Sequence, residues 1–392
     1  MSDKTLKPGW KMVKFGEVVK NVNLVERDPA ANGIDRIVGL EHIDPENLHI
    51  RRWDSGEDST SFTRKFVQGQ TLFGKRRAYQ RKVAYAEFEG ICSGDILTFE
   101  PKNKKMLLSE LLPFICQSDA FFNHALDTSA GSLSPRTSWT ALQDFEFPLP
   151  PLDEQKRIAE ILWAADEALV RFEQARESLL KVADISATDF LSRGWETKNL
   201  GKLLIDVQYG SSTRVASNGS GTAPILRIPN VIGGKIILDE LAFVDLSASE
   251  VNRYRLSRGD VLIVRTNGNP EYVGRTAVVE NLPENCVYAS YLIRLVPNAE
   301  LLLPKYLHAA LSSSLMRRTL KHEIRSSAGN YNLNTKGIKG QVIPLPPLQK
   351  QLEFVAHFES FERKMSQIDS HIFSLRNLRL TIANQEIGAA HV

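Results

Sequence analysis

An internal repeat constrains the fold of this 392-residue chain more than any other feature. Residues 148–152 read Pro-Leu-Pro-Pro-Leu, and residues 344–348 repeat the same five letters 196 positions later. Flanking pieces recur in the same order, since the Ser-Ala-Gly of 129–131 returns at 327–329. A repeated sequence specifies a repeated structural unit. The chain is therefore predicted to be a duplicated module of about half its length.

Each copy divides into a strand-rich part and a long helix. Short apolar and β-branched runs, separated by Gly, Pro, Asn and Asp, fill roughly the first 140 residues of a copy and predict an α+β domain. No Pro or Gly occurs in 152–191, and apolar residues there follow helical spacing. In the second copy a helix is predicted over 348–387. Its apolar residues have the 4-3 spacing of a coiled coil. The two stripes are Ile158, Ile161, Leu162, Ala165, Leu169, Phe172, Leu179 and Val182, and Phe361, Met365, Ile368, Ile372 and Leu375.

The repeat sets the predicted domain boundaries at 1–147, 148–192, 193–343 and 344–392. A helix of about 40 residues is about 60 Å long and cannot bury its apolar stripe against itself. The simplest partner is the other helix, running antiparallel. Packing of each helix on its own domain is the alternative. The predicted fold class is α+β, with two pseudo-repeated globular domains separated by two long antiparallel coiled-coil helices.

Charge balance and cysteine spacing exclude several protein classes. Forty-nine Lys and Arg against 46 Asp and Glu give a net charge of +3, too small to predict nucleic-acid binding by itself. No apolar run approaches the roughly 18 residues of a membrane span, and the start lacks a signal peptide's apolar core. The three cysteines are widely spaced, which predicts buried thiols rather than a disulfide framework or a CxxC metal site. We expect a folded cytoplasmic protein.

Cations concentrate in one stretch of the first domain. Seven Lys and Arg and no acid lie between Arg64 and Lys82, with Tyr79 among them. This pattern is typical of a loop offered to a phosphate backbone, and a solvated basic loop is the alternative interpretation. The DNA-binding candidates of the first domain are Lys75, Arg76, Arg77, Tyr79, Arg81, Lys82 and Arg136.

The second domain carries Arg and Asn at corresponding places. These side chains recognise guanine and adenine edges with paired hydrogen bonds, although Asn-rich loops are also ordinary turns. Their recurrence in both copies favours a binding role. The candidates are Arg265, Asn267, Asn269, Arg275, Arg325, Asn330, Tyr331, Asn332 and Lys336.

Catalytic motifs are incomplete throughout the sequence. Residues 69–76 nearly match the phosphate loop GxxxxGK[ST], but Arg76 replaces the hydroxyl that would hold Mg²⁺. Asn-Pro-Glu-Tyr at 269–272 departs from the Asn-Pro-Pro-Tyr of adenine methyltransferases at Glu271. The eight histidines show no HExxH or other metal-ligand spacing. The pattern predicts a binder with no catalytic residue, metal or cofactor of its own.

The start of each long helix is a candidate protein-docking surface. Acids outnumber bases nine to five over 152–191, so this helix is not expected to lie on phosphates. A long amphipathic helix with acids outside suits docking of protein subunits, and a solvated face is the alternative. The partner-binding candidates are Asp153, Glu154, Gln155, Arg157, Gln349 and Gln351.

The sequence resembles the specificity subunits of type I restriction-modification enzymes over its whole length. The resemblance rests on the duplicated plan and on residues 148–159, Pro-Leu-Pro-Pro-Leu-Asp-Glu-Gln-Lys-Arg-Ile-Ala, which are similar to the family's helix-start motif. Residues 72–84 and 90–93 also resemble a frequent target-recognition sequence. The second copy departs from the pattern, because Gln-Lys-Gln at 349–351 replaces the usual acidic-Glu-Gln start.

The resemblance implies a function in a larger complex. Two target recognition domains would each recognise one half of a bipartite DNA site, and the helices would act as a spacer ruler. Two modification subunits, which hold S-adenosylmethionine and methylate adenine, would bind the helices. Motor-nuclease subunits, which use ATP and Mg²⁺, would cleave the DNA. A repeat adaptor with protein-only contacts is the main alternative, and a stand-alone nuclease or methyltransferase is a third.

Overall fold

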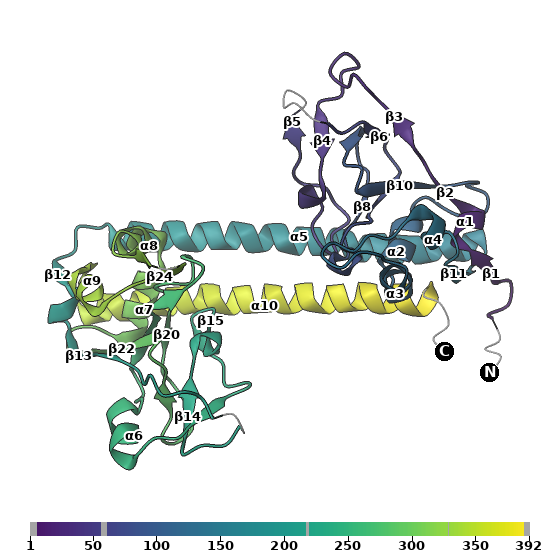
Figure 1. The fold of residues 1–392 in the computed structure, drawn as a ribbon. Helices are drawn as coiled ribbons and strands as arrows, with labels where there is room; N and C mark the ends of the chain where they lie inside the picture. The colour runs from purple at the N-terminus through teal and green to yellow at the C-terminus, as the bar shows by residue number, and fades with distance from the viewer. Residues whose placement is uncertain (1–5, 56–60, 217–218, 328, 388–392) are drawn as a thin grey trace. The chain divides into compact units, whose positions relative to one another are not determined.

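The computed structural model describes residues 6–55, 61–216, 219–327 and 329–387. The chain forms two compact units (Figure 1). Unit 1 contains residues 1–174 and 370–392, and unit 2 contains residues 175–369. The second half of each long helix therefore belongs to a different unit from its first half.

Unit 1 contains two main sheets. The first is antiparallel, with Val19–Asn21 (β2), Ile96–Pro101 (β10), Thr71–Gly74 (β7) and Val83–Tyr85 (β8) in that order. The second has Leu24–Val25 (β3), Arg64–Phe66 (β6), Gly90–Cys92 (β9), Arg36–Val38 (β4) and Asp54–Ser55 (β5) in that order. In addition, Lys11–Lys14 (β1) pairs antiparallel with Glu146–Leu149 (β11).

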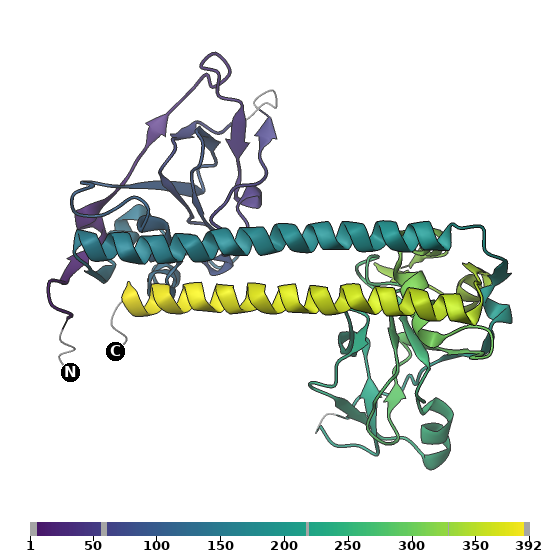
Figure 2. The same ribbon diagram turned by 180° about the vertical axis from the view of Figure 1, so that it is seen from behind.

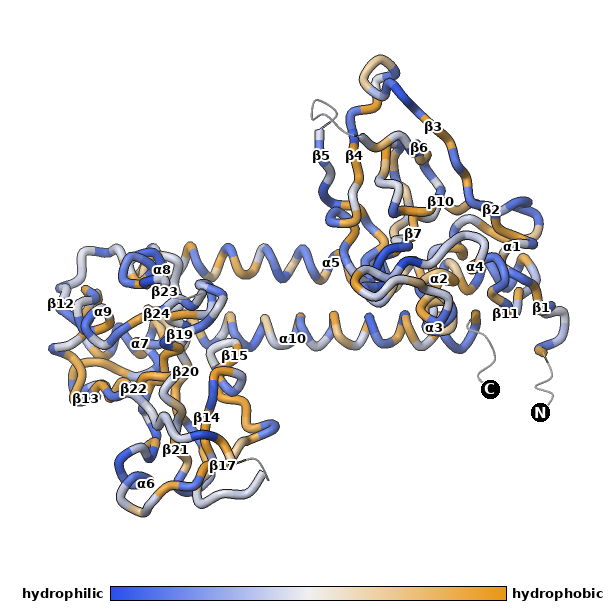
Figure 3. Tube along the Cα trace, viewed as in Figure 1, coloured by the Kyte–Doolittle hydropathy of each residue, from blue (hydrophilic) through white to orange (hydrophobic). Residues whose placement is uncertain are grey.

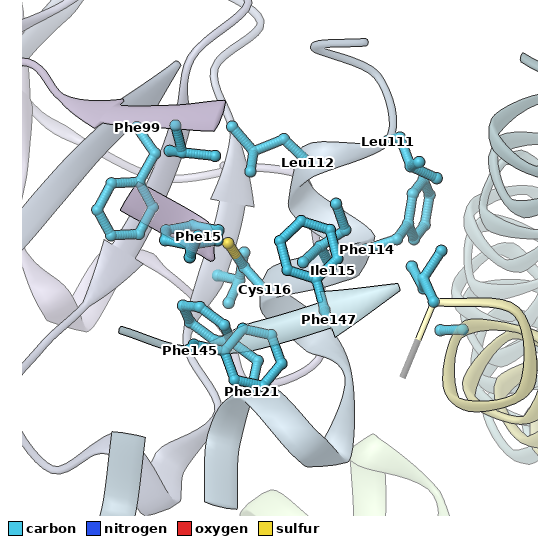
Figure 4. Packing of buried hydrophobic residues seen from close by; sticks show 14 of the residues in the cluster. Phe15, Phe99, Leu111, Leu112, Phe114, Ile115, Cys116, Phe121, Phe145 and Phe147 are labelled. Carbon is cyan, nitrogen blue, oxygen red and sulfur yellow. The ribbon is translucent and has the colours of Figure 1, made fainter. Parts of the chain in front are cut away.

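An aromatic core fills unit 1 between the first sheet and its short helices. The helices are Phe15–Val18 (α1), Leu112–Gln117 (α2), Asp119–Asp127 (α3) and Trp139–Leu142 (α4). The Phe15 and Phe121 rings lie 4.9 Å apart, and Phe145 stacks on Phe147 at 5.8 Å (Figure 4). All these rings are buried, so the core fixes the sheet whose strand ends carry the candidate loops.

Unit 2 repeats the same plan. Its main sheet has Leu204–Tyr209 (β13), Leu292–Pro297 (β22), Val261–Val264 (β18) and Thr276–Val278 (β20) in that order. The smaller sheets are Ala242–Val244 (β17), Ala223–Leu226 (β14) and Val287–Tyr288 (β21); Val231–Ile232 (β15) with Lys235–Ile236 (β16); and Thr266–Asn267 (β19), Asn330–Asn332 (β24) and Arg325–Ser327 (β23). The helices are Ala248–Tyr254 (α6), Pro304–Ser312 (α7), Ser314–Lys321 (α8) and Thr335–Gly340 (α9).

The two main sheets have equivalent strand orders, β2-β10-β7-β8 and β13-β22-β18-β20. The pairing of β1 with β11 also has a counterpart, because Thr197–Asn199 (β12) pairs antiparallel with Val342–Pro344 (β25). The strand β7 thus corresponds to β18. The predicted duplication is confirmed at the level of topology.

The long helices, Leu152–Leu191 (α5) and Leu348–Glu386 (α10), pair antiparallel within each unit (Figures 1 and 2). In unit 1 Arg376 Nη2 lies 2.8 Å from Glu173 Oε1, and Arg379 contacts Asp166. The partner numbers rise along α5 as they fall along α10. The predicted antiparallel pair is therefore confirmed, and the alternative in which each helix packs only on its own domain is wrong.

The same order holds in unit 2. Arg176 Nε lies 2.6 Å from Asp369 Oδ1, and the Phe190 and Phe354 rings stack at 4.5 Å.

The predicted apolar stripe of α5 is only partly buried, because Ile161 and Val182 are 41% and 53% exposed. Pairing with one helix and one domain covers only part of the circumference, so apolar residues at the stripe's edges stay exposed.

Each domain core is completed by both long helices. In unit 1 the aromatic cluster includes Ile158 and Leu162 of α5, and also Ala383 of α10 and Ile387, which directly follows it. Ala383 is 2% exposed and Ile387 is fully buried. The last turn of the chain's final helix is thus a structural part of the domain formed by the first residues.

A buried glutamine fixes the start of α5. The Gln155 side chain is 1% exposed, and its Nε2 donates to the carbonyl oxygens of Met106 and Pro150, both at 2.8 Å. Its Oε1 accepts from the Leu108 N–H at 3.0 Å. The Gln155 amide group therefore binds backbone groups of the domain, and its assignment to partner binding stays a prediction.

Gln351 makes the same three contacts at the start of α10. Its Nε2 donates to the carbonyl oxygens of Leu301 and Pro346, both at 2.9 Å, and its Oε1 accepts from the Leu303 N–H at 2.9 Å. The side chain is fully buried, and its assignment to partner binding stays a prediction. The repeated glutamine holds the start of each helix against its domain, because its amide NH₂ donates to two backbone carbonyls and its amide oxygen accepts from one backbone N–H.

The hydropathy of the long helices alternates along their length rather than forming one apolar run (Figure 3). In the described part of the chain, no helix combines the length and the hydropathy that a bilayer span requires.

Candidate nucleic-acid interface

In unit 1 the loop that follows β7 pairs with a distant segment. The Thr137 N–H donates to the Lys75 carbonyl at 3.0 Å, and the Arg77 N–H donates to the Pro135 carbonyl at 2.7 Å. Between these bonds Arg76 and Arg136 form an isolated antiparallel bridge. The structure thereby brings Arg136 beside the basic loop.

One carboxylate serves two guanidinium groups at this place. Asp95 Oδ2 lies 3.5 Å from Arg76 Nη1, and Asp95 Oδ1 lies 3.0 Å from Arg136 Nε. Burial lowers the pKa of the nearby Lys75 ammonium, and the charges of Arg64 and Arg136 lower it further while Asp95 raises it. We call Lys75, Arg76 and Arg136 the cation cluster. With one acid among three cations, an anion from outside would be favoured here.

The tip of the basic loop is exposed. Tyr79 is 55% exposed within a short 3-10 turn at Ala78–Gln80, and Arg77 is exposed just before it. Arg77 has a φ of 54°, a left-handed conformation that non-glycine residues adopt rarely. The turn thus projects a cation and an aromatic ring into solvent, which suits contact with a nucleic acid.

Two predicted members of the loop point into the domain instead. Arg81 Nη2 donates to the Gln117 carbonyl and to Asp119 Oδ1, both at 2.8 Å, and its guanidinium lies over the Phe122 ring. Lys82 Nζ donates to the Leu40 carbonyl at 2.5 Å. These bonds use both cations to hold the loop against the domain. The assignment of Arg81 and Lys82 to DNA binding stays a prediction.

Unit 2 builds the same arrangement after β18. The Leu333 N–H donates to the Arg265 carbonyl at 2.9 Å, and Thr266 pairs with Asn332. Arg265 therefore occupies the position of Lys75, and Asn332 that of Arg136. The structure brings the predicted residues of 265–267 and 325–332 together in the sheet β19-β24-β23.

The Arg265 guanidinium is held between an aromatic ring and a backbone carbonyl. It lies 4.7 Å from the centre of the Tyr209 ring, and its Nη1 donates to the Ser290 carbonyl at 3.3 Å. Its Nε is buried and has no hydrogen-bond partner among the described residues. A buried donor left unpaired costs about 1–3 kcal/mol, so this group is suited to an acceptor supplied from outside.

The asparagines of the β18 loop act as turn residues. Asn267 Oδ1 accepts from the Asn269 N–H at 2.8 Å, and Asn269 Oδ1 accepts from the Glu271 N–H at 3.0 Å. The turn interpretation of these residues is thus confirmed. Their amide NH₂ groups can still donate to DNA, but paired recognition of adenine would also need the carbonyl oxygen.

The remaining candidates of unit 2 differ in exposure. Arg275 is exposed, its guanidinium lies 3.8 Å from the Tyr272 ring centre, and its Nε donates to the Glu271 carbonyl. Arg325 and Asn330 are exposed, as is Lys336 on α9, whereas Tyr331 is half-buried against the core. Their role in DNA binding stays a prediction.

Two arginines outside the predicted set, Arg214 and Arg227, line a cavity together with the exposed Tyr291. A signal was present, because residues 207–238 contain three cations and no acid. This is the same kind of pattern as in 64–82. It was overlooked because the cations are spread over Ser- and Gly-rich sequence rather than gathered in one run.

At the helix starts Asp153, Arg157 and Gln349 are exposed and Glu154 is half-buried. Their assignment to partner binding stays a prediction.

In the described regions, one group of side chains, Glu41, His42 and Asp54, has possible metal-ligand atoms close to one another. However, His42 Nδ1 accepts from the Gly39 N–H at 2.9 Å, so in the neutral ring Nε2 carries the proton and cannot bind a metal.

The three thiols, Cys92, Cys116 and Cys286, are free and buried, as predicted. Burial raises the pKa of Cys92 and of Cys286 to about 12. Such thiols stay protonated at neutral pH.

The model of the type I restriction modification DNA specificity domain matches the chain twice, at residues 9–182 and 192–372. The chain belongs to this family. Each match covers one copy of the duplicated plan, so this type I specificity protein has two DNA specificity domains. The predicted role as a DNA-recognition component, rather than a catalyst, agrees with the family's function.

Known specificity subunits support this membership. The chain is 29% identical over 290 residues to the specificity subunit of type I restriction enzyme EcoKI of Escherichia coli K12. The aligned region covers 69% of this chain and 62% of that protein. The crystal structure of the S subunit of a type I restriction-modification system from M. genitalium superposes on this chain with a TM-score of 0.59 and 14% identity. The superposition covers 98% of this chain and 96% of that subunit.

A second solved structure comes from work on complex assembly and conformational transition of a type I R-M system. Its chain superposes on this one with a TM-score of 0.57 and 21% identity, over 97% of this chain and 98% of that chain. At these identities the two solved structures support the fold. The fold class predicted from the repeat is thus confirmed.

Proposed function

We propose that this type I specificity protein recognises a bipartite DNA target, with one half-site bound by each domain. The observation that carries the proposal is the equivalent construction after β7 and β18. In both units a cation follows the strand, and its backbone carbonyl accepts an N–H from a segment that supplies a second DNA-binding candidate, Arg136 or Asn332. Cations would position each domain on phosphates, and the Arg and Asn side chains would select bases.

In this proposal catalysis belongs to partner subunits. Two modification subunits would dock on α5 and α10, bring S-adenosylmethionine and methylate adenine. Motor-nuclease subunits would bring ATP and Mg²⁺ and cleave DNA. The exposed polar residues Asp153, Arg157 and Gln349 support docking at the helix starts. The complex would act in the cytoplasm, where the DNA lies.

We further propose that 1–147 and 193–343 are the target recognition domains and that 148–192 and 344–392 set the unread spacer. Half-sites separated by about one turn of DNA, ~34 Å, are common for proteins with two DNA-binding modules. A spacer of this kind requires helices that run without interruption, and α5 and α10 are each continuous over about 40 residues.

A methylation map of genomic DNA tests the proposal. Cells expressing the chain with its modification subunit are compared with cells lacking the chain. We expect a new methyladenine motif made of two half-sites around an unread spacer. An assembled complex that produces no new motif would favour the protein-only adaptor.

A further inference from the structure

A cavity of about 380 Å³ lies in unit 2 at the end of β14. Its walls are formed by residues 211–215, residues 225 and 227–229, and residues 289–291. Its volume falls in the ~300–1,000 Å³ range of ligand pockets. We call it the β14 pocket.

The β14 pocket is positively charged. Arg214 and Arg227 line it, and none of its lining residues is an acid. The Nε of Arg227 is buried and has no hydrogen-bond partner in the described part of unit 2. The backbone N–H of Arg227 is fixed by Asn230 Oδ1 at 2.9 Å. An arginine with a fixed backbone and an unpaired buried side-chain donor is suited to an anionic acceptor.

The remaining lining separates into a hydroxyl side and an apolar side. Ser212 and Thr213 are exposed, and they directly follow Ser211, whose carbonyl accepts the Ser290 N–H at 2.7 Å. The apolar side consists of Val215, Ile225, Ile228 and Pro229. Cations and hydroxyls beside an apolar wall match a phosphate attached to a sugar.

The β14 pocket adjoins the candidate site built around Arg265. The Arg265 N–H donates to the Tyr291 carbonyl at 2.8 Å, and Arg265 Nη1 donates to the Ser290 carbonyl. Ser290 and Tyr291 both line the pocket. A DNA strand that reaches Arg265 would therefore pass the mouth of the pocket.

We propose that the β14 pocket seats one deoxyribose-phosphate unit of the DNA backbone. Arg227 and Arg214 hold the phosphate, and Ile228 and Pro229 contact the sugar. Base recognition from a groove requires side chains that protrude, whereas this site is concave. An extruded base would need flat stacking partners, and Tyr291 is the one aromatic residue of the lining. The inference rests on the proposed DNA-binding function and adds a contact that is independent of base sequence.

Binding of the assembled complex to cognate and non-cognate duplexes, measured between 50 and 200 mM salt, tests the inference with Arg227→Gln. One lost phosphate contact reduces the slope of log affinity against log salt by about 0.9. We expect about tenfold weaker binding at 50 mM for both duplexes, and the defect should shrink by about 3.5-fold at 200 mM.

Companion variants separate the outcomes. Arg214→Gln changes an exposed side chain and should give the same signature without affecting folding, and Arg227→Lys should keep the salt slope. Arg253→Gln, which removes an exposed arginine of α6 outside the pocket, is the control and should bind as the unaltered protein does. Unchanged binding by Arg227→Gln and Arg214→Gln, or a loss confined to the cognate duplex, would overturn the inference. Failure of the unaltered complex to prefer its cognate duplex would instead refute the proposed function.

Discussion

Asp95 is the residue that sets the charge of the cation cluster in unit 1. It lies between the Arg76 and Arg136 guanidinium groups, and its backbone carbonyl also accepts the Lys75 N–H at 3.0 Å. The carboxylate therefore both organises the two arginines and neutralises part of their charge. Loss of its charge should leave a stronger site for phosphate.

We expect Asp95→Asn to tighten binding of non-cognate DNA by the assembled complex about threefold at 50 mM salt, because one unit of negative charge is removed from the interface. Arg76→Gln should weaken the same binding. The measurement is a fluorescence-anisotropy titration at several salt concentrations.

Asp144→Asn is the matched control, since Asp144 is exposed and its carboxylate lies 3.7 Å from a single cation, Lys14 Nζ. Equal tightening by both Asp variants would show that the overall charge, and not the cation cluster, controls DNA binding.

Gln155 and Gln351 give a second prediction at this scale. Gln155→Ala or Gln351→Ala leaves two carbonyls and one N–H without their partner, and should lower the free energy of unfolding by about 2–4 kcal/mol. Urea unfolding followed by circular dichroism checks this. Gln349→Ala changes an exposed residue two positions away and should stay within about 0.5 kcal/mol. Loss of DNA targeting with unchanged stability would instead favour the partner-binding interpretation.

At the scale of elements, a network of charged side chains connects the globular domain of unit 1 with both long helices. His49 Nε2 lies 2.7 Å from Asp166 Oδ2 on α5, and His49 Nδ1 lies 2.9 Å from Glu87 Oε1. Arg379 of α10 contacts Asp166 and the Glu46 carbonyl. The hydrogen bond to Asp166 raises the pKa of His49, with Glu87 adding to it and burial opposing it.

This network predicts a stability that depends on pH. Protonated His49 is favoured in the folded state, so its contribution is complete below the unfolded-state pKa of about 6.5 and is lost as pH rises through the higher folded-state pKa. The free energy of unfolding of unit 1 should therefore fall as pH rises above about 6.5. In His49→Gln this decline should be absent, as urea titrations at several pH values would show. An identical decline in both proteins would assign it to another group.

The sequence predicted the elements better than the use of individual side chains. The Pro-Leu-Pro-Pro-Leu repeat and the apolar spacing located α5 and α10, because helix periodicity is a local property of the sequence. The contacts of Arg81 and Gln155 within the domain could not be predicted, because their partners, such as Asp119 and Met106, come from distant segments. Those contacts exist only once the chain has folded. The Arg265 site was found because the repeat carried information from one copy to the other.

At the scale of the whole molecule, both long helices contain residues of both units. In the proposed function, their length sets the number of unread base pairs. One heptad adds about 10.5 Å of helix, which corresponds to about three base pairs of duplex.

We expect insertion of one heptad after Gln174 and one after Asp369 to lengthen the spacer of the methylated motif by about three base pairs, with both half-sites unchanged. Methylation mapping of cells expressing this variant gives the result. A heptad inserted in α5 alone shifts the contacts between α5 and α10 out of register and should abolish methylation. Altered half-sites with an unchanged spacer would contradict the ruler.

The burial of Ala383 and Ile387 in the core of unit 1 bears on how the protein is made. Residues 1–174 leave the ribosome well before Ala383 and Ile387, which complete the core of unit 1, are synthesised. At about 5–20 residues per second, the domain waits roughly 10–40 s with part of its apolar surface uncovered. The core of unit 1 therefore stays incomplete until residues 383–387 have been synthesised, and a truncation before Ala383 should destabilise the domain formed mainly by residues 1–147.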